Sequence, residues 1–190
     1  MRARRVAGLS LIAFAAAAAE DAARTWSFRE DALEREPAGF AFARTGRGRP
    51  GRWVVRADPG APGGERVLAQ VDADDTDHRF PVAVADEPRP RDLHLEVRCR
   101  TVSGKVDQAC GLVFRFQGPD DYYLARANAL EDNVRLYRVV KGRRQELAGW
   151  NGTVARGAWH ALAVEARGPR LRVLFDGRAV IEAEDGTFPG

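Results

Sequence analysis

Apolar and polar residues alternate in short runs over most of the chain after residue 52. Gly, Pro, Asn or Asp separates each run from the next, which is the strand and turn spacing of a β-sandwich or barrel. Only residues 31–36 hint at a helix, and that segment is short. The pattern therefore predicts an all-β fold. The predicted strands are 40–44, 52–57, 67–71, 80–84, 93–101, 110–117, 122–127, 134–140, 159–166, 170–175 and 179–184.

Dipeptides between these runs predict hairpin turns. Asp176-Gly177 is the clearest, and Lys141-Gly142 and Asn151-Gly152 are further candidates. Gly adopts positive φ at no steric cost, and Asn and Asp tolerate it better than most residues. A strict two-residue loop at Asp176-Gly177 would place Arg172 opposite Ile181, a polar residue against an apolar one. We therefore predict a β-bulge or a register slip in this hairpin.

Cys99 and Cys110 are the only cysteines of the chain. Both lie on the apolar faces of their predicted strands, 93–101 and 110–117. A hairpin at Gly104-Lys105 would place them opposite each other, at a Cα separation of about 5.5 Å that a disulfide can span. They form either a disulfide or two buried thiols that act as small hydrophobes. Neither arrangement is catalytic, because no pattern here activates a thiolate.

The first 19 residues carry the three parts of a secretory signal peptide. Arginines at positions 2, 4 and 5 precede the uncharged stretch 6–19, which ends in Ala17-Ala18-Ala19. Cleavage before Glu20 would leave residues 20–190 as one secreted or periplasmic domain. Uncleaved, 6–19 would act as a short anchor. No later apolar run approaches the roughly 20 residues of a membrane span, so we expect no membrane contact after cleavage.

The charge of the chain argues against nucleic-acid binding. The chain has 30 basic and 27 acidic residues. Three of the basic residues and none of the acidic ones lie in the predicted signal peptide, which leaves 27 of each and a net charge of zero. A nucleic-acid binder needs a surplus of cations to displace phosphate counterions. The sequence carries no signal for the oligomeric state.

Two stretches carry a family resemblance. GAWHALAVEA at 157–166, with the later Gly168 and Asp176-Gly177, resembles the late strands of concanavalin A-like lectin/glucanase domains, including laminin-G-like modules. Residues 102–116 and 120–148 resemble the 3-keto-disaccharide hydrolase-like group of that superfamily. The resemblance covers about residues 68–190. It implies a two-sheet antiparallel β-sandwich (jelly roll) with one concave sheet that in such domains often meets sugar.

The resemblance also implies a difference at the end of the chain. Domains of this group usually continue past a motif like Thr187-Phe188-Pro189-Gly190 into a further strand that closes the sandwich. We therefore expect the sandwich to lack its last C-terminal strand. Another segment supplies that strand, or the reading frame is truncated, or a sheet edge stays exposed.

Polar residues concentrate between Val106 and Tyr137, among predicted strands, and this is where a binding face is expected. Sugar recognition uses planar hydrogen-bonding groups and an aromatic ring for the apolar face of the sugar. The alternative is an ordinary solvated sheet face with charge pairs, such as Arg126 with Glu131 or Asp132. The predicted substrate-binding residues are Arg115, Arg126, Asn128, Asn133, Arg135 and Tyr137.

Asp107 and Glu131 are the candidate catalytic residues, because a glycoside hydrolase needs two carboxylates about 5 to 10 Å apart. The Glu-x-Asp-x-x-Glu strand of retaining glucanases of the superfamily does not occur, which disfavours that activity. A 3-keto-sugar hydrolase would instead need a base beside the ketone, either Glu131 or His160. His160 shares its strand face with Leu162 and is better interpreted as structural.

The acidic run from Asp72 to Asp77 does not fit an EF-hand. A loop that starts at Asp72 needs Gly at position 77 and Glu at position 83, where the chain has Asp77 and Ala83. An acidic surface turn is the better interpretation, although a looser calcium site stays open. We predict no metal site and no cofactor, because no zinc spacing, phosphate-binding loop or nucleophile elbow occurs.

The sequence leaves three functions open. The first is an exported carbohydrate-binding domain, with a carbohydrate ligand as its partner. The second is a hydrolase that acts on 3-keto-disaccharides or related glycosides. The third is a structural or protein-interaction module.

Overall fold

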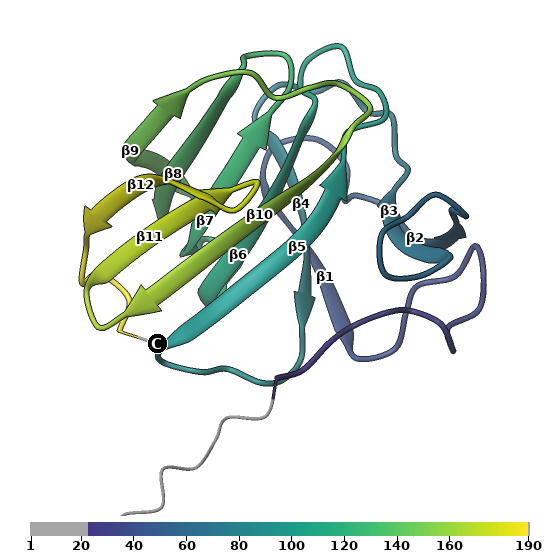
Figure 1. Ribbon diagram of the computed structural model, residues 1–190, viewed down its shortest axis with the longest axis horizontal. Helices are drawn as coiled ribbons and strands as arrows, with labels where there is room; N and C mark the ends of the chain where they lie inside the picture. Colours follow the sequence, from purple (N-terminus) through teal and green to yellow (C-terminus); the bar gives the residue numbers. More distant parts are fainter. Residues whose placement is uncertain (1–22, 190) are drawn as a thin grey trace, which may run out of the picture.

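Two four-stranded antiparallel sheets pack face to face in the computed structural model, which describes residues 23–189 (Figure 1). The predicted signal peptide, residues 1–19, lies outside this range. The front sheet has the order β12-β11-β10-β5, and the back sheet has the order β6-β7-β8-β9. Two smaller sheets, β1-β4 and β2-β3, lie beside them (Figure 1). The predicted all-β sandwich is confirmed. The strands are β1 Phe40–Gly46, β2 Trp53–Ala57, β3 Arg66–Gln70, β4 Arg79–Ala85, β5 Leu93–Arg100, β6 Ala109–Gly118, β7 Asp121–Asn128, β8 Asn133–Val140, β9 Arg143–Asn151, β10 Trp159–Arg167, β11 Arg170–Phe175 and β12 Arg178–Glu184.

The core lies between the two large sheets and follows the period-two pattern of the strands. Within the front sheet, Val164 of β10 stands opposite Leu95 of β5 on one side and Val173 of β11 on the other. Leu136 of β8 belongs to the same buried cluster and comes from the back sheet. Val164, Val173 and Leu136 are wholly buried, so each contributes about 1.5 to 3 kcal/mol of transfer free energy, whereas Leu95 packs against the cluster as a partly buried residue. In the described residues, no helix is long and apolar enough to cross a membrane.

A disulfide joins Cys99 to Cys110 across the sandwich, and it corrects the predicted hairpin. Cys99 lies in β5 of the front sheet, opposite His160, whereas Cys110 lies in β6 of the back sheet, opposite Ala127. The Cα atoms are 6.3 Å apart. Residues 101–108 therefore pass from one sheet to the other instead of forming a two-residue turn. The disulfide ties the sheets together and closes this loop.

Two of the three predicted turns are confirmed. Lys141 and Asp176 have φ of 50° and 48°, and the glycine after each also has positive φ, which is the geometry of a type I′ hairpin. The bulge predicted near Asp176-Gly177 lies between Val173 and Leu174. The prediction of a hairpin turn at Asn151-Gly152 is wrong, because Asn151 ends β9 and a longer loop leads to β10.

Strand β9 was not predicted, because its sequence does not alternate. A register shift between Leu136 and Tyr137 of β8 leaves Ala148 opposite Leu136 and Glu146 opposite Tyr137. Leu147 is the extra residue, and such a bulge breaks the period of two. The strand is instead recognised by its pairing with β8 after the Lys141-Gly142 turn.

The helix suggested at residues 31–36 is also wrong. Glu34 has φ of 58°, which a right-handed helix does not allow. Its backbone N–H donates to the carbonyl of Val55, and the N–H of Val55 donates to the carbonyl of Arg35. The segment therefore lies along the edge of β2 as a bend that satisfies backbone groups of that strand.

We predict that the double substitution Cys99→Ser and Cys110→Ser lowers the free energy of unfolding by about 3 kcal/mol, because the bond restricts the unfolded chain. Urea denaturation of the variant and of the native protein measures this loss. Adding a reductant should lower the midpoint of the native protein and leave that of the variant in place. A native midpoint that does not respond to the reductant would contradict the bond.

Candidate functional site

The outer face of the back sheet, turned away from the core, carries most of the predicted binding residues. Arg126 and Asn128 of β7 stand opposite Arg135 and Asn133 of β8, and Tyr137 follows on the same face of β8. The alternation of each strand sends their apolar neighbours into the core. Five of the six predicted binding residues therefore come together.

Arg126 is the centre of a buried polar network on this face. Its Nη2 donates to Oε2 of Glu131 at 2.7 Å and to Oδ1 of Asn133 at 3.0 Å. Its Nη1 lies 3.8 Å from Oδ2 of Asp107, and the guanidinium carbon lies 5.7 Å from the ring centroid of Tyr137. Its Nε is buried without a hydrogen-bond partner among residues 23–189. We call Asp107, Arg126, Asn128, Glu131 and Asn133 the polar cluster.

The two amides of the polar cluster have fixed orientations. Asn128 Nδ2 donates to Oδ1 of Asp107, and Asn128 Oδ1 accepts the backbone N–H of Leu130 at 2.9 Å. Asn133 Nδ2 donates to Oε2 of Glu131 at 2.9 Å. Arg126, Asn128 and Asn133 are only 6%, 0% and 5% exposed. The expected Arg126–Glu131 pair is present, but burial of this kind is not that of an ordinary solvated sheet face.

The two carboxylates are the exposed members of the cluster. The side chains of Asp107 and Glu131 are 41% and 51% exposed. Desolvation raises the pKa of Asp107, and the charge of Arg126 only partly opposes it. The hydrogen bond from Asn133, and then the contact with Arg126, lower the pKa of Glu131. Two carboxylates beside one guanidinium thus have pKa values shifted in opposite directions.

The side chain of Arg135 contacts three residues of β9 next to the cluster. Its Nη2 donates to Oδ1 of Asn151 at 2.7 Å, its Nη1 donates to the carbonyl of Trp150 at 2.9 Å, and its Nε lies 3.3 Å from Oε1 of Glu146. Gly149 makes room for it, because a Cβ there would stand 2.7 Å from Arg135 Cδ. The guanidinium of Arg135 is therefore engaged on its donor edges.

Two residues of this face were missed in the sequence. The guanidinium carbon of Arg144, from β9, lies 4.5 Å from the ring centroid of Phe80 in β4 and 4.6 Å from that of Tyr137. Arg144 stands opposite Val139. Counting across a two-residue loop at Lys141-Gly142 gives this same pairing. The predicted turn was therefore enough to place Arg144 opposite Val139. It was missed because β9 itself was not predicted.

Arg115 does not belong to the site, which corrects its predicted role. It lies in a register shift of β6 with φ of 48°, and its side chain is 1% exposed. Its guanidinium donates to the carbonyls of Phe188, Gly168 and Arg91 at 3.1, 2.8 and 3.0 Å. Arg115 therefore joins chain segments at the edge of the sandwich.

The same register shift moves Phe116, which alternation alone assigns to the core. Its ring packs on that of Tyr122 with centroids 5.5 Å apart, and Tyr122 shares its strand face with Arg126. The hydroxyl group of Tyr122 hydrogen-bonds Thr45 Oγ1 of β1 at 2.8 Å. This end of the outer face is thus covered by β1.

His160 is structural, as its strand position suggested. Its Nδ1 lies 2.8 Å from Oδ2 of Asp176, and its Nε2 lies 3.1 Å from the carbonyl of Ala155. Its ring also packs on Phe175, with centroids 4.8 Å apart. Both ring nitrogens contact groups of the protein, and neither contacts a residue of the polar cluster.

The acidic run forms a turn held by arginines. Asp72 Oδ1 lies 3.2 Å from Nη2 of Arg79, and Asp74 Oδ2 lies 3.6 Å from Nε of both Arg79 and Arg49. Hydrogen bonds from Thr76 and from the backbone of Arg49 lower the pKa of Asp74. Within the described part of the chain, no group of three or more His, Cys, Asp or Glu residues is arranged to hold a metal ion.

Comparisons with known proteins show the fold. No family model matches the chain. No curated protein matches it either. Among solved structures, the carbohydrate-binding module CBM66 from Bacillus subtilis is similar, with a TM-score of 0.61 and 21% sequence identity over 80% of this chain and 82% of that chain. The match supports the two-sheet antiparallel β-sandwich fold.

We predict that Glu131→Gln lowers the free energy of unfolding near pH 7 by a few tenths to about 1 kcal/mol, because the side chain is half exposed. The pKa of Glu131 is lowered on folding from its ordinary 4.5, so the ionised group stabilises the fold above that pH. The stabilisation is lost as the pH falls through the folded pKa. Urea denaturation over this range should show the two proteins converging below about pH 4.5. A gap that stays constant down to about pH 3 would contradict an ionised Glu131 in the network.

Proposed function

We propose that the protein binds carbohydrate on the outer face of the back sheet. One observation carries this proposal: a buried set of planar polar groups, Arg126, Asn128 and Asn133, holds the two half-exposed carboxylates of Asp107 and Glu131 on this face. Carboxylates accept hydrogen bonds from sugar hydroxyl groups. The ring of Tyr137 is only 7% exposed and lies against the guanidinium groups of Arg126 and Arg144, so it does not serve as a stacking surface for sugar. The similar fold of a protein described as a carbohydrate-binding module adds support.

The hydrogen bonds inside the polar cluster favour such binding. Asp107 is held by Asn128, and Glu131 is held by both Arg126 and Asn133. Rotamers that are already fixed lose little entropy when a ligand arrives. The cluster therefore presents acceptors to a sugar in an arrangement that the free protein already has.

We also propose that the protein works outside the cytoplasm, in a secreted or periplasmic location. The Cys99–Cys110 disulfide supports this, because such bonds persist in oxidising compartments. The predicted signal peptide at residues 1–19 supports it independently.

A glycan array followed by isothermal titration calorimetry tests the binding. We expect binding of at least one glycan, and at least a tenfold loss of affinity in Asp107→Asn and in Glu131→Gln, because each change removes a charged acceptor. Glu182→Gln is the matched control, since this exposed carboxylate of β12 lies on the front sheet and should leave the affinity unchanged. A folded protein that binds no glycan would overturn the proposal.

A second candidate is hydrolysis of 3-keto-disaccharides or related glycosides, and one observation favours it. Asp107 and Glu131 both contact the guanidinium group of Arg126, and their pKa values are shifted in opposite directions. Carboxylates whose environments separate their pKa values suit the two roles of acid and base. Glu131 would be the base that removes the proton beside the ketone.

Incubation with a 3-keto-disaccharide tests this activity, with product release followed by chromatography. We expect turnover by the native protein and a loss of at least a hundredfold in Glu131→Gln, which is the usual contribution of a general base, about 10² to 10⁴. Binding of the same compound without turnover would leave the carbohydrate-binding function and exclude the hydrolase.

A further inference from the structure

The guanidinium of Arg144 lies between two aromatic rings at the edge of the polar cluster. Phe80 comes from β4 and Tyr137 from β8, and each ring centroid lies within 4.6 Å of the guanidinium carbon. The planar guanidinium stacks on aromatic faces, which holds it in place while its N–H groups stay on the edge of the plane. Phe80 and Tyr137 thus fix the position of Arg144 without using its donors.

Arg144 differs from the other arginines of this face in its partners. Arg126 pairs with Glu131, and Arg135 pairs with Glu146. The side chain of Arg144 has no hydrogen bond or ion pair with any residue of 23–189, and it is exposed. A cation held in place by two rings, with its donors unused, is a ready site for an acceptor from outside the protein.

We propose that Arg144 binds an anionic group of the carbohydrate ligand, a carboxylate of a uronic acid sugar. The edge of a guanidinium presents parallel N–H groups whose spacing matches the two oxygens of a carboxylate. Free hydroxyl groups also accept such bonds, but only an anion gains the full charge-assisted pairing. The inference rests on the proposed carbohydrate-binding function and names the class of sugar.

The carboxylates near Arg144 determine where the ligand's anion lies. Asp107 and Glu131 interact electrostatically with Arg144, and Glu146 lies on the same face. All three already pair with Arg126 or Arg135. Their charges repel a second anion, so the ligand's carboxylate is expected on the edge of Arg144 that points away from them. Hydroxyl groups of the same sugar would then donate hydrogen bonds to the carboxylates of Asp107 and Glu131.

Calorimetric titration with two forms of one oligosaccharide tests the inference. The first is an oligogalacturonate, and the second is its methyl ester, which keeps the ring and hydroxyl groups but loses the charge. We expect the acid to bind about tenfold more tightly than the ester, the effect of one charge-assisted pair. A sulfated neutral oligosaccharide is the third probe, and it distinguishes a carboxylate site from a general anion site.

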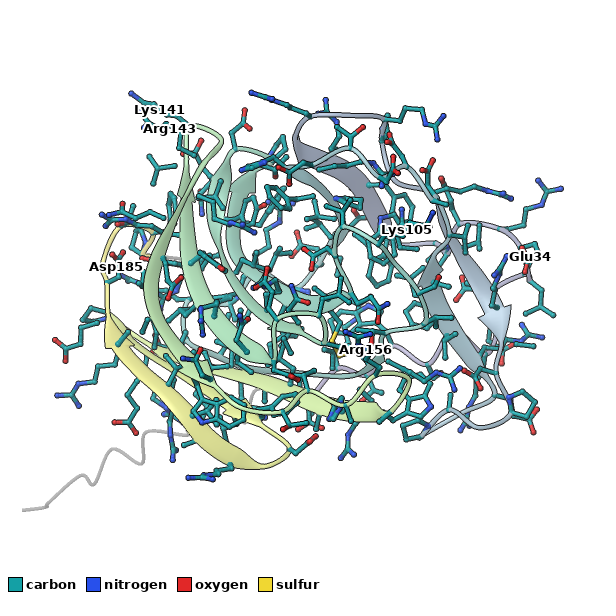
Figure 2. The ribbon with its side chains drawn as sticks, turned by 90° about the horizontal axis from the view of Figure 1, so that it is seen from above. Glu34, Lys105, Lys141, Arg143, Arg156 and Asp185 are labelled. Carbon is teal, nitrogen blue, oxygen red and sulfur yellow. A yellow bond between two sulfur atoms is a disulfide. The ribbon has the colours of Figure 1, made fainter. Side chains whose placement is uncertain are left out.

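Variants separate the role of Arg144 from a structural one. Arg144→Ala should abolish the preference for the acid over the ester, and Arg144→Lys should retain only part of it, because an ammonium group lacks the planar fork. Arg143→Ala is the matched control: Arg143 lies beside Lys141 at the outer tip of the β8–β9 turn, where it carries the same charge one residue away (Figure 2). That variant should keep the preference.

The outcomes distinguish this inference from the proposed function. Equal binding of acid and ester by the native protein, or tighter binding of neutral glycans, overturns the role of Arg144 and leaves carbohydrate binding in place. A preference for the sulfated probe over the uronate overturns the carboxylate assignment. No binding to any glycan overturns the proposed function itself. The comparison of acid with ester uses the native protein, so it holds even where Arg144→Ala fails to fold.

Discussion

The burial of one guanidinium determines how the outer face of the back sheet is built. A buried charge is strongly destabilising unless it is paired and hydrogen-bonded. Arg126 meets this requirement through Glu131, Asn133 and Asp107, which come from a turn, a strand and a loop. Asp107 also accepts a hydrogen bond from Asn128, Glu131 accepts one from Asn133, and Asn133 is fixed by its place in β8. The polar cluster is therefore a consequence of the burial of Arg126.

The fold brings these partners together from separate parts of the sequence. The β7–β8 hairpin supplies Arg126, Glu131 and Asn133 from residues close in the chain. Asp107 comes from the loop between the two sheets, which the Cys99–Cys110 disulfide closes. The disulfide thus stabilises the fold and also helps to position the site, because it restrains the loop that carries Asp107.

Local alternation is enough to predict most of the fold and much of the site. The outward positions of Arg126, Asn128, Asn133, Arg135 and Tyr137 follow from alternation within two regular strands. Arg115 and Phe116 could not be placed in this way, because a register shift inside β6 reverses their faces. Strand β9 was missed for the same physical reason, and Arg144 with it. The partner sheet of Cys110 depends on long-range pairing, which no local pattern contains.

The role of the polar cluster is tested by nuclear magnetic resonance of the ¹⁵N-labelled protein during titration with glycans. The side-chain amide signals of Asn128 and Asn133 and the Nε–H signal of Arg126 report on the cluster itself. We expect these three signals to shift with saturation, together with backbone signals of β7, β8 and β9, while those of β11 and β12 stay in place. Saturable shifts confined to the front sheet, with the three cluster signals unmoved, would contradict a sugar site on this face.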